Sequence, residues 1–83
     1  MEIMMIKTEE MIKEDLMKLC GWVEHSYHLK DGFFQNEFTK LIHNLLEDLK
    51  KANDEDEYKG ILASTERTLM VLAQRHQQFY EKG

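Results

Sequence analysis

Side chains that bind metals or take part in catalysis are concentrated in the segment from Cys20 to His28. This segment holds a thiol, the Glu24 carboxylate and the imidazoles of His25 and His28. The two histidines are three residues apart, so they lie on one face if the segment is a helix. Zinc accepts thiolate, imidazole and carboxylate ligands, and a cysteine beside a histidine can act as a nucleophile. Metal binding and covalent catalysis are therefore the chemistries that this segment suggests.

The spacing of these residues argues against both chemistries. The sequence contains no CxxC, HExxH or Glu-x-x-His pair and no Gly-rich phosphate loop. Glu24 and His28 are four residues apart, which is typical of a pair on a helix surface. Cys20 borders an apolar stripe, where a buried thiol is usually inert. We therefore expect no catalytic residue, no metal and no cofactor, and we expect the protein not to be an enzyme.

A second cluster of polar side chains forms if the last helix folds back along the first. Arg75 and His76 would then reach the level of His25 and His28. An arginine can hold a carboxylate or a phosphate with two hydrogen bonds, and a histidine can make a contact that depends on pH. The alternative hypothesis is a small ligand, an anion or a metal ion bound at this His/Arg-rich end. Its ligand-binding residues would be His25, His28, Arg75 and His76.

Three helices are predicted to position these residues, over residues 8–29, 33–51 and 55–81. The 83-residue chain has no Pro and only four Gly, so little interrupts a helix. Short corners make neighbouring helices antiparallel. The predicted fold is therefore all-α: a single domain, residues 1–83, forming an antiparallel up-down-up three-helix bundle. In an alternative arrangement, the last two helices form a hairpin and the first crosses to a second chain.

Residues that commonly cap helices mark the predicted boundaries. Thr8 is suited to cap the first helix. Gly32 can take the left-handed conformation that ends a helix, and Asp31 can cap the next one. Asp54 and Glu57 have the three-residue spacing of a capping box, which predicts the start of the third helix.

The apolar residues exceed what one helical seam can hold. Residues 69–72 read Leu-Met-Val-Leu, and four successive apolar residues cover every side of a helix. Met70 and Val71 therefore lie off the seam, as do Met11 and Trp22 on the first helix. A contiguous apolar patch usually binds something, and methionines adapt to different partner shapes. We expect these four residues to bind a protein partner, and we expect the chain to form a homodimer.

The charged residues provide a second candidate surface. The net charge of −5 disfavours direct nucleic-acid binding, because a phosphate backbone attracts basic surfaces. Asp54, Glu55, Asp56 and Glu57 form a run of acids that could dock a basic protein. Acids at a helix N-terminus also stabilise the helix itself, which is the competing explanation for the same run.

The composition also bears on location. A single cysteine suits a reducing compartment. No window is apolar enough to span a membrane, and the first ten residues lack the features of a signal peptide. We therefore expect a cytoplasmic protein that does not bind membranes. The predicted function is that of a small, acidic, regulatory interaction module of the inhibitor or adaptor type.

Overall fold

The structure is a computed structural model that describes residues 7–81, with side chains described through residue 77. Within residues 7–81 the chain forms helices and turns, with no strand. The helices are α1 (Glu9–Ser26), α2 (Phe33–Glu37), α3 (Thr39–Lys50) and α4 (Glu55–Glu81). The predicted all-α class is confirmed, but this part of the chain has four helices where three were predicted.

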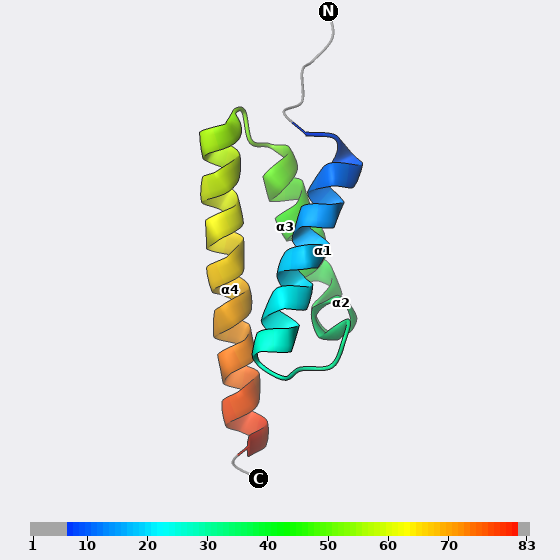
Figure 1. Cartoon of the computed structure of the whole chain (residues 1–83), viewed down its shortest axis with the longest axis vertical. Helices are drawn as coiled ribbons and strands as arrows, with labels where there is room; N and C mark the ends of the chain where they lie inside the picture. The colour runs from blue at the N-terminus through cyan, green and yellow to red at the C-terminus, as the bar shows by residue number, and fades with distance from the viewer. Residues whose placement is uncertain (1–6, 82–83) are drawn as a thin grey trace, which may run out of the picture.

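The helices lie lengthwise beside one another (Figure 1). α1 runs in one direction, α2 and α3 return beside it, and α4 runs in the direction of α1. α1 contacts the other three helices, and α3 also contacts α4. The first turns of α1 and α4 lie at the same end as the last turn of α3 (Figure 1). The corner between α1 and α2 lies at the opposite end.

The core lies between α1, α3 and α4, with one residue added from α2. In α1 the buried positions include Ile12, Leu16 and Val23, which recur at steps of four and seven residues along one helix face. The buried apolar residues are Ile12, Leu16, Cys20, Val23, Phe34, Leu45, Leu49, Tyr58, Leu69 and Ala73. This set occupies the inner face of each helix and leaves the outer faces for surface functions.

The first helix begins at its predicted cap but ends earlier than predicted. The Thr8 hydroxyl accepts a hydrogen bond from the Met11 N–H at 3.2 Å, as expected for an N-cap. The predicted end at residue 29 is wrong, because the last helical residue is Ser26. The chain leaves the helix at Tyr27 and turns toward α2.

His28 makes this early ending possible by adopting a left-handed backbone conformation, with φ of 59°. The N–H of Leu29 donates to the Glu24 carbonyl at 2.7 Å, and the N–H of His28 donates to the His25 carbonyl at 3.2 Å. These two bonds form a Schellman motif, in which the left-handed position usually holds Gly. The helix-ending role predicted for Gly32 therefore belongs to His28.

The predicted second helix, residues 33–51, is wrong as one continuous element. It is interrupted at Phe38, whose φ and ψ of −129° and 48° are not helical. The Thr39 hydroxyl donates to the Gln35 carbonyl at 2.7 Å and so occupies an acceptor that a continuous helix would use. The break also lets the Phe38 ring pack edge-on against Phe33, with ring centroids 5.9 Å apart.

The start of α4 follows the predicted capping box. An Asp54 carboxylate oxygen accepts the Glu57 N–H at 2.8 Å. The Glu57 carboxylate reaches back and accepts the Asn53 N–H at 2.7 Å. These two bonds satisfy backbone donors that the helix itself leaves unpaired. The helix they start covers the predicted range 55–81.

Candidate functional site

Trp22 lies on the outer side of α1, next to α4, with 51% of its surface exposed. It lines two grooves of about 450 Å³ each, one on either side. The first, which we call the Lys18 groove, is lined by Lys7, Asp15, Lys18, Leu19, Trp22, Glu55, Tyr58, Lys59 and Leu62. The second, the Met70 groove, is lined by Trp22, Ala63, Glu66, Arg67, Met70, Val71 and Gln74. Together the two grooves form what we call the Trp22 face.

Helix geometry explains why these apolar side chains remain outside the core. Trp22 directly precedes the buried Val23, and one residue rotates the helix by about 100°, which turns Trp22 away from the core. Met70 follows the buried Leu69 in the same way and is half-buried at the groove wall. Val71 is rotated further and is exposed. Any sequence that buries Val23 and Leu69 on these helices therefore presents their neighbours along the α1–α4 boundary.

The structure brings together three of the four predicted partner-binding residues. Trp22, Met70 and Val71 line the Met70 groove. Met11 has 47% of its side chain exposed but lines neither groove. It lies eleven residues before Trp22, or about 16 Å along the helix. Met11 is therefore not part of the Trp22 face as defined by the grooves.

A polar cluster forms one wall of the Lys18 groove. The Tyr58 hydroxyl donates to an Asp15 carboxylate oxygen at 2.6 Å, and the Lys7 amine lies 3.5 Å from the same oxygen. The Lys7 amine also lies 5.1 Å from the centre of the Tyr58 ring. Burial, followed by the hydrogen bond to Asp15, raises the pKa of Tyr58. Tyr58 is therefore a neutral hydrogen-bond donor that fixes this wall.

Two of the four acids at the predicted acidic surface have structural roles. Asp54 and Glu57 accept backbone N–H groups at the start of α4, so capping explains their presence. All four acids, Asp54 to Glu57, are exposed. Helix capping therefore explains two of these four acids without a protein partner.

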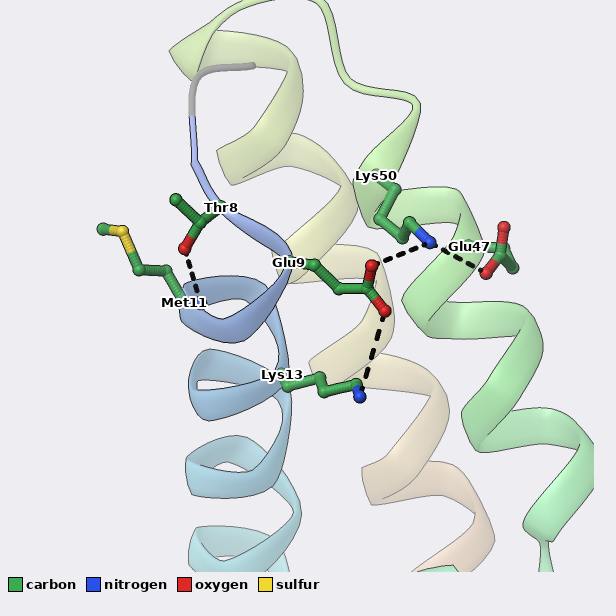
Figure 2. Close-up of polar contacts among 6 residues, drawn as sticks. All are labelled: Thr8, Glu9, Met11, Lys13, Glu47 and Lys50. Atoms are coloured by element: carbon green, nitrogen blue, oxygen red, sulfur yellow. Dashed lines mark hydrogen bonds and ion pairs between the residues drawn. The ribbon is translucent and has the colours of Figure 1, made fainter.

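Lysines from two helices contact the acids at the same end of the molecule. Figure 2 shows the Glu9 carboxylate lying between two amines, 3.9 Å from Lys13 and 3.6 Å from Lys50. The Lys50 amine also lies 3.3 Å from the Glu47 carboxylate. The Glu9–Lys50 pair connects α1 to α3, and the three pairs together place lysine amines beside the Glu9 and Glu47 carboxylates.

The predicted His/Arg-rich end is only partly assembled. His28 and His76 line one cavity of about 730 Å³ between the α1–α2 corner, α2 and α4. His25 and Arg75 are exposed and do not line it. The cavity also has an aromatic wall, Phe33 and Phe38, which the sequence analysis did not assign to a site.

Glu24 is buried, with 4% of its surface exposed, so its expected surface pairing with His28 is wrong. Its two carboxylate oxygens accept the N–H groups of Gly32, at 3.0 Å, and of Phe34, at 3.1 Å. Glu24 thereby caps α2 from another helix, a role predicted for Asp31. One sequence signal could have indicated this: Glu24 follows Leu16 and Cys20 at steps of four, so it is an acid on the apolar stripe.

Cys20 is fully enclosed, with 1% of its surface exposed. Burial, with a smaller effect from the nearby Glu24, raises the pKa of the Cys20 thiol to about 11. The thiol is therefore protonated near neutral pH and is a poor nucleophile or metal ligand. Among the residues described, no three His, Cys, Asp or Glu side chains gather closely enough to hold a metal ion.

Comparisons with protein family models, curated proteins and solved structures found nothing that matches this chain. In the part of the chain that the structure describes, none of the helices has the length and apolar character needed to cross a membrane. Any assignment of function therefore depends on the geometry and chemistry of the surfaces described above.

Proposed function

We propose that the protein is a small, acidic, non-enzymatic interaction module of the inhibitor or adaptor type, which binds a protein partner through the Trp22 face. One observation carries the proposal: Trp22, with 51% of its surface exposed, lines two grooves and lies beside Met70 and Val71. Tryptophan is enriched among the residues that contribute most to protein binding. Methionine side chains adapt to different partner surfaces.

The shape of the Trp22 face favours a helix as the segment that docks on it. Both grooves follow the boundary between α1 and α4, and amphipathic helices commonly bind along such helix-lined grooves. Asp15 in the Lys18 groove is paired with Lys7, so Lys18 and Lys59 outnumber the remaining acid, Glu55, and favour acidic residues at one end of that segment. We therefore propose that the partner presents an amphipathic helix with an apolar stripe and an acidic end.

In the absence of this partner, we expect two copies of the chain to cover their Trp22 faces in a homodimer. A two-fold axis near Trp22 would place the Lys18 groove of one copy over the Met70 groove of the other. Lys18 and Lys59 of one copy would then approach Glu66 of the other. Such a dimer would compete with the partner for the same surface. We assign both complexes to the cytoplasm, where a single buried thiol such as Cys20 stays reduced.

Site-specific crosslinking tests the proposed surface. A photoreactive phenylalanine at Val71, which is exposed in the Met70 groove, would be activated in cells that make the protein. A second chain carrying the same group at Met17, which has 37% of its side chain exposed but lines neither groove, is the matched control. We expect a specific crosslinked protein from position 71 and none from position 17.

Affinity for the purified crosslinked protein then provides the quantitative test. The Trp22→Ala variant should weaken binding by about tenfold or more, because an interface tryptophan commonly contributes over 1.4 kcal/mol. The Met17→Ala variant should bind as the original chain does. Equal weakening by both variants would contradict the proposal. If position 71 crosslinks only to a second copy of the chain, the Trp22 face is a homodimer interface and the proposal of a separate protein partner is wrong.

A further inference from the structure

The cavity at the other end of the molecule has the dimensions of a small-molecule site. Its volume of about 730 Å³ falls within the range of several hundred Å³ that is typical of ligand pockets. It shares no lining residue with the Trp22 face, although Gln74 of the Met70 groove contacts Tyr27 of the cavity. Its walls come from the α1–α2 corner, from α2 and from α4. Residues 27–38 and the last part of α4, which are distant in sequence, therefore meet around one partly open cavity.

Hydrogen bonds hold the walls of this cavity in place. The Gln77 side-chain amide donates to the Tyr27 carbonyl at 2.6 Å, which ties α4 to the corner. The Gln74 amide donates to the Tyr27 hydroxyl at 3.2 Å. Glu24 fixes the other side of the corner, because its carboxylate binds the Gly32 and Phe34 N–H groups. The cavity is therefore preorganised, which lowers the entropic cost of binding a ligand.

Aromatic rings form much of the apolar wall. The Phe33 ring packs against Phe38 at 5.9 Å between centroids, with their planes at 62°. On its other side, Phe33 lies 4.6 Å from the His76 ring, with their planes at 59°. Rings prefer offset or edge-on contacts with a further ring. A flat aromatic group is therefore the apolar ligand that this wall suits best.

The charged groups around the cavity favour an anion. His28 and Lys30 come from the corner, Glu37 comes from α2 and His76 comes from α4. Among the lining residues whose side chains are described, the other titratable group is the Tyr27 phenol. Among these described side chains, His28, Lys30 and His76 are basic and Glu37 is acidic, so basic groups outnumber the carboxylate. His28 is also held in a left-handed conformation that is unfavourable for a residue with a side chain, and such strain is often found at binding sites.

We propose that this cavity binds a small aromatic carboxylate, with its ring against Phe33 and Phe38 and its carboxylate toward Lys30 and His28. The ring replaces water along the apolar wall, and the carboxylate accepts charge-assisted hydrogen bonds at the rim. This site is independent of the Trp22 face, so either proposal can fail without the other.

Titration with matched probes tests the proposal. Backbone amide NMR signals would be followed during addition of 2-naphthoate and, separately, of 2-naphthylmethylammonium, which has the same ring and the opposite charge. We expect 2-naphthoate to shift the amides of Lys30, Phe33 and Gln77 and to bind about fivefold or more tightly than the ammonium probe. Equal binding of both probes, shifts confined to the Trp22 face, or no saturable binding at millimolar concentrations would overturn the proposal.

Exposed substitutions separate a direct contact from a general effect of charge. Lys30→Glu should weaken binding of 2-naphthoate by about tenfold, because it reverses a charge at the rim. Lys40→Glu makes the same charge change at an exposed position outside the cavity and should leave binding almost unchanged. His28→Asn should weaken binding of 2-naphthoate, because it removes an imidazole from the cavity lining, whereas His25→Asn, outside the lining, should leave it almost unchanged. Equal effects within either pair would overturn the assignment of the site to this cavity.

Discussion

Glu24 connects the end of α1, the corner and the start of α2 through a single residue. Its carbonyl accepts the Leu29 N–H, and its carboxylate accepts the N–H groups of Gly32 and Phe34. The carboxylate is buried, so no water can replace it if it is lost. The position of the cavity wall depends on these bonds, because Phe33 lies between the two residues whose N–H groups Glu24 binds.

The first prediction at the residue scale follows from this arrangement. Glu24→Gln should lower the free energy of unfolding by about 1–3 kcal/mol, because an amide offers one acceptor where two buried N–H groups need one each. Glu14→Gln, at an exposed position of the same helix, should change it by no more than about 0.5 kcal/mol. Urea denaturation of both variants measures the difference. Equal stabilities of the two variants would show that the cap contributes nothing.

A second prediction at this scale concerns Cys20 and pH. Burial raises the pKa of its thiol from 9.0 to about 11 in the folded protein. Above pH 9.0 the unfolded chain loses this proton while the folded chain keeps it. The contribution of the protonated thiol to the free energy of unfolding is therefore fully present below pH 9.0 and is lost as the pH rises toward about 11. Between pH 9.0 and about 11, the free energy of unfolding should fall less steeply with pH for Cys20→Ala than for the original chain. An unchanged slope would refute the assignment of this pH dependence to Cys20.

At the scale of elements, local signals predicted some helix boundaries and not others. The boundaries at Thr8 and at Asp54 were correct, because each depends on a side chain bonding to backbone three residues away. The break at Phe38 was missed, since it depends on the packing of that ring against Phe33 as well as on the Thr39 hydroxyl. The early end of α1 was missed because it requires His28 to adopt a conformation that usually favours Gly.

The strain at His28 leads to a prediction for the end of α1. His28→Gly should raise the free energy of unfolding by up to about 1 kcal/mol, because Gly adopts a positive φ without steric cost. His25→Gly, three residues earlier and inside the helix, should lower it by about 1 kcal/mol. Thermal or urea denaturation of both variants would compare the free energies of unfolding after the same replacement at the two positions. A loss of stability in both variants would contradict the left-handed assignment of His28.

At the scale of the whole molecule, two surfaces with no lining residue in common lie on one small helical framework. The core uses one face of each helix, so α1 and α4 leave Trp22, Met70 and Val71 along their boundary. The grouping of these three was predictable from the sequence, because it follows from helical rotation relative to the buried stripe. The aromatic cavity was not, because its walls come together only after α2 separates from α3 and Glu24 fixes the corner.

The most direct test of the Trp22 face is the accessibility of its indole to a soluble quencher. Trp22 is the single tryptophan of the chain, so intrinsic fluorescence in a complex with a tryptophan-free partner segment reports on this face alone. Acrylamide quenching would be measured for the free protein, diluted until its mass in solution is that of a monomer, and after addition of the segment identified by crosslinking. We predict efficient quenching in the free monomer and strong protection in the complex. Equal quenching in the two states would mean that the partner binds elsewhere and would contradict the proposed function.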